Sequence, residues 1–123
     1  MPAAFAAATV SVIASTEPEA FGRVSAESLA VGTPVIATNL GAPPETLAGL
    51  DHFGGLVPPG DAAALAAALA EALNLGPERR ADFAAAARAH VATNFSLAAM
   101  QSQTLAVYDR LLGSKLALSL RNA

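Results

Sequence analysis

Two short runs of apolar, β-branched residues most constrain what this chain can fold into. Residues 9–14 and 34–38 are rich in valine, isoleucine and threonine, which is typical of buried strands. Between them, residues 23–31 have apolar residues at helical spacing, and Gly32 follows at the position where helices commonly end. A strand, a helix and a second strand in this order predict parallel strands joined by a helical crossover.

A third short strand is predicted at residues 55–57, before the breaker Pro58-Pro59-Gly60. The fold class is therefore α/β, with a partial Rossmann-like parallel sheet of about three strands and covering helices. Three strands fall short of the roughly five or six that are typical of a sheet. We accordingly expect further strands upstream in a longer protein.

Helical patterns fill most of the remaining sequence. A short helical turn is expected at residues 45–48, and another helix covers 78–93. Asp61 and Ser96 are good N-caps for two more helices. On one face of each capped helix we expect a row of larger apolar residues: Leu65, Leu69 and Leu73 in the first, and Leu97, Met100, Val107 and Leu111 in the second.

Composition excludes several classes of function. The net charge is −3 with only seven basic residues and no basic cluster, so nucleic-acid binding is not expected. Cysteine is absent, which excludes thiolate metal sites and disulfides. His52 and His90 stand alone without metal-ligand spacing around them, so no metal site is expected.

The chain also lacks a clear targeting or membrane segment. Residues 1–15 are apolar but have no positively charged start, as a signal peptide would. No apolar run reaches the roughly 18 residues that a membrane span requires. We expect a cytoplasmic protein without a transmembrane segment, with peripheral association of a longer protein at the inner face of the membrane left open.

The segment with the most chemical information runs from Glu19 to Glu27, with the sequence EAFGRVSAE. In a continuous helix the two glutamates would lie about 80° apart around the axis. Pro18 and Gly22 argue against such a helix. Glu19 is therefore expected to project from a loop and Glu27 from one turn inside the helix that follows.

This layout suits a nucleotide-sugar. Free amides at the helix start, from Gly22 to Ser25, can donate hydrogen bonds to a diphosphate, and the helix dipole favours the anion. A carboxylate can accept hydrogen bonds from two neighbouring hydroxyls of a ribose or hexose. The alternative is that both glutamates are solvated charges beside an ordinary loop, and the spacing alone does not decide between the two.

Further motifs along the chain decide between these two interpretations of the glutamates. They are the 19–27 segment, Gly32 to Thr38, Gly41, Glu45, Gly55 to Asp61, and Phe95-Ser96. With these motifs the chain resembles the retaining glycosyltransferases of family 4, also called glycosyltransferase group 1. Their signature is a pair of glutamates separated by seven residues. The resemblance covers residues 1–112, leaving 113–123 as a C-terminal tail. It implies part of the C-terminal, donor-binding domain of a GT-B fold.

The resemblance also implies roles for individual residues. Glu19 matches the glutamate that faces the donor sugar at the reacting centre, and Glu27 matches the one that binds the ribose. The other donor-binding positions are Phe21 and Gly22 in the loop, Arg23, Val24 and Ser25 at the helix start, and Gly41 and Glu45 at the pocket edge. Two roles stay open: Phe21 is alternatively a core anchor, and Glu45 alternatively supports the pocket without direct contact.

Two departures from the family pattern stand out. The family often has two glycines where this chain has Gly41-Ala42, and we expect little effect from the added methyl group. The family's phosphate-binding arginine and lysine, its base-binding loop and its acceptor-binding N-terminal domain have no counterpart here. Arg23 is the only basic residue near the motif and a poor substitute for that pair. We therefore expect an incomplete enzyme.

The resemblance implies transfer of a sugar from a nucleoside-diphosphate sugar to an acceptor hydroxyl, with retention and without an obligatory metal or other cofactor. The expected partners are the donor and a glycan or lipid-linked acceptor, such as a bacterial cell-envelope polysaccharide. The chain alone is expected to be inactive. Alternatives are a non-catalytic nucleotide-sugar-binding or structural fragment, or a related GT-B epimerase or phosphorylase. Donor base, donor sugar and acceptor stay open.

Overall fold

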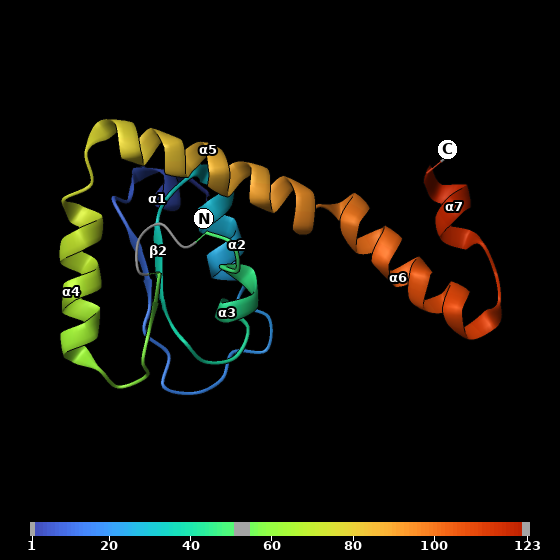
Figure 1. Cartoon of the computed structure of the whole chain (residues 1–123), viewed down its shortest axis with the longest axis horizontal. Coiled ribbons are helices and arrows are strands. Elements are labelled where there is room, and N and C mark those ends of the chain that lie inside the picture. Colours follow the sequence, from blue (N-terminus) through green and yellow to red (C-terminus); the bar gives the residue numbers. More distant parts are fainter. Residues whose placement is uncertain (1, 51–54, 122–123) are drawn as a thin grey trace. The chain divides into compact units, whose positions relative to one another are not determined.

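A computed structural model describes residues 2–50 and 55–121 of the chain. They belong to two compact units, Met1–Ala89 and His90–Ala123. In chain order (Figure 1) the elements are α1 (Pro2–Ala7), β1 (Ser11–Ile13), α2 (Arg23–Val31), β2 (Val35–Thr38), α3 (Pro43–Thr46), β3 (Leu56–Val57), α4 (Ala62–Leu73), α5 (Pro77–Asn94), α6 (Leu97–Leu112) and α7 (Leu116–Arg121).

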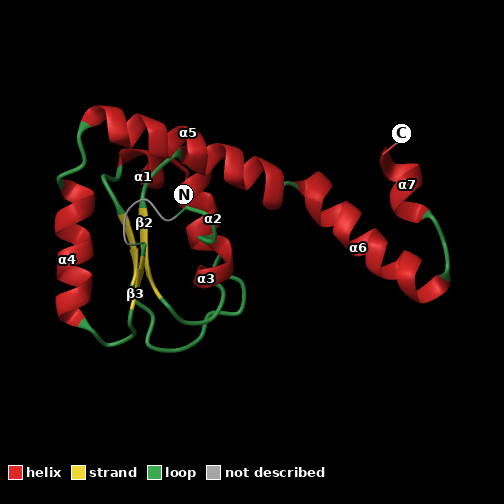
Figure 2. Ribbon diagram, viewed as in Figure 1, coloured by secondary structure: helices red, strands yellow, loops and turns green. Residues whose placement is uncertain are grey.

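The sheet of the first unit is parallel, as predicted. Its order is β1-β2-β3, with Ser11 opposite Val35 and Ala37 opposite Leu56. Pairing begins where the Ser11 amide donates to the carbonyl of Pro34 at 2.8 Å, so β1 is shorter than the predicted 9–14 run. The α/β class and the three parallel strands are confirmed (Figure 2).

Helices cover both faces of the sheet, and β2 is buried along its whole length. On one face, Ile36 and Val57 pack against Ala68 and Ala72 of α4. On the other face lie α2 and α3, and Leu29 of α2 is fully buried (Figure 1). Burial on both faces explains why the strands of a parallel sheet read as continuous apolar runs.

The predicted leucine face of α4 is only partly right. Leu65 and Leu69 pack against the core cluster, but Leu73 is 57% exposed. Ala68 and Ala72 are the buried residues of this helix. Small side chains let the helix backbone lie close to the sheet, so alanines form the contact and the leucines flank it.

Side-chain hydrogen bonds to backbone carbonyls hold α2 and α5 in the first unit. Thr33 Oγ1 donates to the carbonyl of Phe5 at 2.7 Å, and Arg88 donates to the carbonyl of Val31 at 2.9 Å. Gly32 allows α5 to lie close to the end of α2, because a Cβ at position 32 would lie 2.8 Å from the Cβ of Ala84. Its φ of 86° ends α2, as predicted.

The second unit contains the end of α5 and the helices α6 and α7. Ser96 caps α6 by accepting a hydrogen bond from the Ala99 amide at 3.1 Å, as predicted. Asp109 of α6 accepts hydrogen bonds from the amides of Leu116 and Ala117 at the start of α7. The predicted apolar side of α6 is present, but no residue of α6 is buried. The predicted boundary at residue 112 stays a prediction.

Candidate functional site

Two loops that leave the carboxyl ends of β1 and β2 meet at one edge of the sheet. Glu19 and Gly41 form a parallel bridge between the loops. The Ala42 amide also donates to the carbonyl of Glu19 at 3.0 Å. In open α/β sheets, ligands bind outside the carboxyl ends of the strands, so this edge is where a site is expected.

The bridge requires glycine at position 41. Gly41 has a φ of 72°, which L side chains rarely adopt. A Cβ at this position would lie 2.5 Å from both the backbone nitrogen and the carbonyl oxygen of Glu19. Ala42, the departure from the family's double glycine, has a φ of −74°, which any residue adopts.

The Glu19 carboxylate is held by a short chain of hydrogen bonds. Its Oε1 atom accepts from Ser15 Oγ at 3.0 Å. The carbonyl of Ser15 in turn accepts from Thr38 Oγ1 at 2.8 Å, which ties the loop to the end of β2. Sequence reasoning missed the roles of both residues, because no motif includes Ser15 and Thr38 was noted only as the last residue of the motif Gly32 to Thr38. Oε2 lies on the side of Gly22, 3.6 Å from where a Cβ of that glycine would be.

The start of α2 has no side-chain cap. Gly22 is its N-cap, with a φ of 63° and no side-chain hydrogen bond. By contrast, α4 and α6 are capped by Asp61 and Ser96. Within the described ranges, no protein acceptor takes the amides of Arg23 and Val24. Uncapped amides at a helix start form an anion site when a ligand supplies the acceptor.

Ser25 differs from the prediction in its backbone amide. Its amide is not free, because it donates to the carbonyl of Gly22 at 3.0 Å. Its side chain is fully buried, and Oγ has no hydrogen-bond partner. The free amides therefore stop at Val24, one residue earlier than predicted, since the first turn of α2 closes on itself at Ser25.

Glu27 lies one turn inside α2, as predicted, and is paired with Arg23. Nη2 of Arg23 lies 3.2 Å from Oε1 of Glu27. The side chains are 77% and 41% exposed respectively, so the pair is accessible to solvent. The structure thus brings a guanidinium group and a carboxylate together beside the open helix start.

The remaining predicted residues surround this arrangement. Phe21 is 65% exposed, so the alternative that it anchors the core is wrong. Val24 is also exposed, at 40%, and is not part of the core face of α2. Glu45 is exposed in the first turn of α3, the helix that follows the Gly41 loop.

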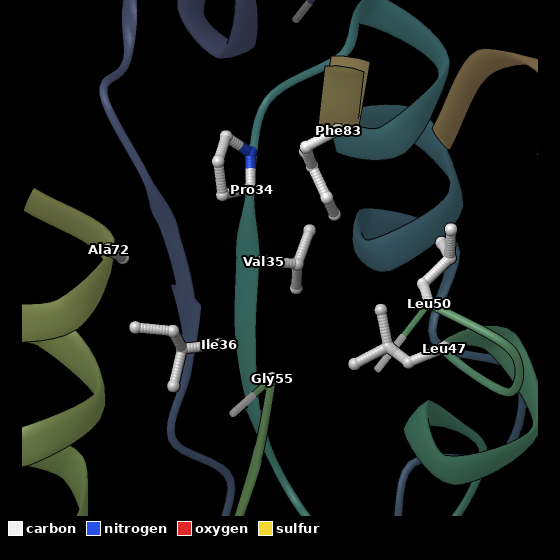
Figure 3. Close-up of a pocket in the computed structure, with 8 residues that line it drawn as sticks. All are labelled: Pro34, Val35, Ile36, Leu47, Leu50, Gly55, Ala72 and Phe83. Atoms are coloured by element: carbon white, nitrogen blue, oxygen red, sulfur yellow. The ribbon is translucent and has the colours of Figure 1, made fainter. Parts of the chain in front are cut away.

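A small cavity in the same unit is unrelated to these residues. It lies in the core, around β2, and has a volume of about 10 Å³. Val35, Leu47, Leu50 and Phe83 lie on one side of the strand and Ile36 and Ala72 on the other, as Figure 3 shows. This volume is about that of one water molecule, so the cavity cannot hold a nucleotide or a sugar.

In the part of the chain that the structure describes, no group of three or more histidines and carboxylates could hold a metal ion. His52 lies outside the described residues. No described helix combines the length and the apolar character that crossing a membrane demands. The expectation of a metal-free site stays a prediction.

The arrangement can bind an anion and hydroxyl groups side by side. The open amides and the dipole of α2 favour a phosphate, while Glu19 and Glu27 offer acceptors for hydroxyl hydrogens. Both carboxylates lie near the start of α2 in the chain: Glu19 belongs to the loop before the helix, and Glu27 lies one turn inside it. A ligand with a phosphate between two hydroxyl-bearing groups matches this order.

Comparisons with known proteins identify the family of the chain. Residues 1–90 match the family described as glycosyl transferases group 1. The structure is similar to a crystal structure of a glycosyltransferase from Rickettsia africae, with a TM-score of 0.75 and 37% sequence identity over 86% of this chain. The chain covers 28% of that protein. No curated protein matches. The chain belongs to the group 1 glycosyltransferases.

Proposed function

We propose that this chain provides part of the donor site of a glycosyltransferase that uses a nucleoside-diphosphate sugar. In this proposal, the amides of Gly22 to Val24 bind the diphosphate. Glu19 accepts hydrogen bonds from hydroxyls of the donor sugar, and Glu27 accepts them from the ribose. Gly41 and Glu45 form the neighbouring edge of the pocket.

The position of Glu19 is the observation that carries this proposal. Its carboxylate lies beside Gly22, which is the N-cap of α2 and makes no side-chain hydrogen bond to the helix start. The hydrogen bond from Ser15 occupies Oε1 and orients the carboxylate. A sugar joined to a diphosphate at this helix start would therefore meet Oε2.

The proposed reaction moves the sugar from the diphosphate to an acceptor hydroxyl with retention at the anomeric carbon. The bond between the anomeric carbon and the diphosphate oxygen breaks, and the bond to the acceptor oxygen forms. The amides at the start of α2 stabilise the negative charge on the leaving diphosphate. Glu19 positions the sugar, a task in which small displacements cost rate. Retention and membership of family 4 are part of the proposal.

The acceptor is proposed to bind elsewhere in the whole protein. The chain spans 28% of the length of the related structure, which leaves room in such a protein for an acceptor-binding part. A glycan or a lipid-linked glycan at the cytoplasmic side of the cell envelope is the proposed acceptor. We expect no sugar transfer by the 123-residue chain alone, and measurable transfer by it would contradict this.

Binding of nucleoside diphosphates tests the site directly. We would titrate the chain with UDP, GDP and ADP and follow the amide signals by NMR. The signals of Gly22, Arg23 and Val24 should shift, because their N–H groups would donate to the diphosphate. The amide of Ala64, which already donates to Asp61 at 2.8 Å, is the internal control and should stay unchanged. Equal shifts at both helix starts, or none at either, would refute the proposed site.

Variants separate the roles of the two glutamates. Glu27→Ala should weaken binding of the nucleoside diphosphate and of its sugar conjugate alike, because both contain the ribose. Glu19→Ala should weaken only the conjugate, because only the conjugate contains the sugar. Glu71→Ala, an exposed glutamate on α4, is the matched control and should change neither affinity. In the intact enzyme, Glu19→Ala should depress turnover strongly and Glu27→Ala mainly donor binding.

A purely non-catalytic nucleotide-sugar-binding role is the second candidate. It would use the same binding groups, the open amides at the start of α2 and the carboxylates of Glu19 and Glu27. In that case the whole protein would bind the donor but transfer no sugar. Glu19→Ala would then change donor binding only, because there is no sugar transfer to slow. A transfer assay with the whole protein distinguishes the two roles.

A further inference from the structure

The ion pair between Arg23 and Glu27 is placed against the usual electrostatics of a helix. Arg23 is the first residue of α2, where the helix dipole disfavours a cation. An acidic residue four positions before a basic one stabilises a helix better than the reverse order, and α2 has the reverse order. Neither feature favours the helix itself, and local conflicts of this kind are expected at functional sites.

The contribution of an exposed ion pair to folding stability does not explain the Arg23–Glu27 pair either. With side chains 77% and 41% exposed, the two groups form a direct ion pair at a solvent-accessible surface, where such pairs contribute little to stability. The guanidinium group does, however, hold one oxygen of the carboxylate in a defined place. Oε1 of Glu27 accepts from Nη2 of Arg23 at 3.2 Å, and Oε2 has no protein partner within the described residues.

The direction of the side chains brings this carboxylate toward the proposed ligand. Side chains of an α-helix lean toward its N-terminus, so the Glu27 carboxylate lies over the first turn of α2. That turn carries the free amides of Arg23 and Val24. A ribose attached to a diphosphate at these amides would meet a carboxylate with one oxygen held by Arg23 and the other open.

The charge of Arg23 also matters for an anionic ligand. Arg23 is the only lysine or arginine in residues 1–78, a region with eight carboxylate side chains. Without Arg23, the Glu27 carboxylate would repel a diphosphate that approaches the start of α2. Pairing with the guanidinium group offsets that repulsion while the carboxylate keeps an oxygen free to accept.

On this basis, which rests on the proposed function, we propose that Arg23 is a positioning residue for Glu27. Arg23 orients the Glu27 carboxylate toward the ribose hydroxyls of the donor and does not bind the diphosphate itself. It thereby sets the preference of the site for ribonucleotides over 2′-deoxyribonucleotides. This differs from the sequence-based expectation that Arg23 contacts the donor directly.

The test compares the Kd values of UDP, GDP and ADP with those of their 2′-deoxy counterparts, measured by NMR titration of the 123-residue chain. For the base that binds best, the ratio of the two Kd values measures contact with the ribose. A charge-assisted hydrogen bond predicts a wild-type ratio of about tenfold. Glu27→Gln should reduce the ratio to near one. Arg23→Leu should reduce it at least threefold, and Arg23→Lys should restore part of it.

Two further variants complete the design. Arg23→Leu should have no additional effect on the ratio in the Glu27→Gln background, because Arg23 acts through Glu27. Arg110→Leu removes an exposed arginine of the second unit and should leave the ratio unchanged. If Arg23→Leu does not fold, Arg23→Gln replaces it in the same comparison.

The outcomes separate this inference from the proposed function. If Arg23→Leu weakens ribo- and deoxyribonucleotides equally and keeps the wild-type ratio, Arg23 acts on the diphosphate, and only the inference is overturned. If Glu27→Gln leaves the ratio unchanged, or if the wild type binds no nucleoside diphosphate, both are overturned.

Discussion

The two compact units contrast in how their helices are stabilised. In Met1–Ala89, α2, α4 and the first part of α5 each bury side chains against neighbouring elements. In His90–Ala123, α6 buries none, and Leu97, Leu111 and Leu112 are each more than 65% exposed. Among the described residues, every buried side chain belongs to the first unit.

The difference separates local from long-range stabilisation. The helices of the second unit are stabilised by interactions between residues close in sequence. These are the Ser96 cap, the end of α6 at Gly113 and the hydrogen bonds from α7 amides to Asp109. The sheet of the first unit depends on contacts between residues far apart in sequence, such as Ser11 with Val35. Substitutions that remove burial should therefore affect the units very differently, whereas those that remove caps should affect them alike.

The largest contrast is expected for leucines. Leu29→Ala should lower the free energy of unfolding by about 2–5 kcal/mol, because it leaves a cavity at a fully buried position. Leu111→Ala should change it by no more than about 0.5 kcal/mol, since that side chain is 73% exposed. Urea denaturation followed by circular dichroism measures both. Equal losses would mean that the apolar side of α6 is buried in solution, and the contrast between the units would fail.

Glycines with positive φ should show the next largest contrast. Gly41→Ala should cost about 3 kcal/mol, because strain from the left-handed backbone adds to a clash with Glu19. Gly113→Ala, with a φ of 65° and open space around it, should cost about 1 kcal/mol from the backbone alone. The same denaturation experiment applies. A cost for Gly41→Ala no larger than that for Gly113→Ala would show that the two site loops are not joined as described.

Helix caps should give similar, smaller effects in both units. Asp61→Ala and Ser96→Ala each remove a side-chain acceptor from an amide of the first turn, at 2.8 and 3.1 Å. Each should cost about 1 kcal/mol of local stability. Hydrogen exchange of the Ala64 and Ala99 amides measures the loss in each helix. Protection that falls in α4 but not in α6 would argue against local caps as the main support of the second unit.

The smallest effect is expected at Asp109 and is confined to α7. The hydrogen bond from Ser114, followed by those from the Ala117 and Leu116 amides, lowers the pKa of Asp109, while desolvation opposes the shift. Because the folded form has the lower pKa, the carboxylate stabilises α7 above the usual aspartate range. That contribution disappears as the pH falls through the lowered pKa.

An acid titration followed by NMR tests this. The amide signals of Leu116 and Ala117 should move with a midpoint below that of an aspartate in an unstructured peptide. Asp109→Asn, which removes the titrating group, should abolish the transition. A midpoint at or above the peptide value would contradict the described hydrogen bonds.

The elements were largely predictable because their signals are local. The β-branched composition of β1 and β2, the caps Asp61 and Ser96 and the terminator Gly32 each act within a few residues. The buried face of α4 was not predictable, because it depends on how closely the sheet approaches. Counting leucines favoured Leu73, whereas the core uses Ala68 and Ala72.

The candidate site divides in the same way. Glu19 in a loop and Glu27 inside a helix followed from Pro18, Gly22 and their spacing. Two features did not follow from the sequence. The hydrogen bond from Ser15 to Glu19 depends on a side-chain contact, and the bond from the Ser25 amide to the Gly22 carbonyl depends on the shape of a single turn. The exposure of Phe21 was likewise open in the sequence.

From its residues alone, then, the chain specifies parallel strands, capped helices and a pair of glutamates around a glycine. Those features follow from steric preferences and hydrogen bonds between near neighbours, which the order of residues contains. The joining of Glu19 to Gly41, the pairing of Ser11 with Val35 and the burial of alanines arise only when distant segments pack. A sequence does not state distances between remote residues, because these depend on how all the elements fill space together.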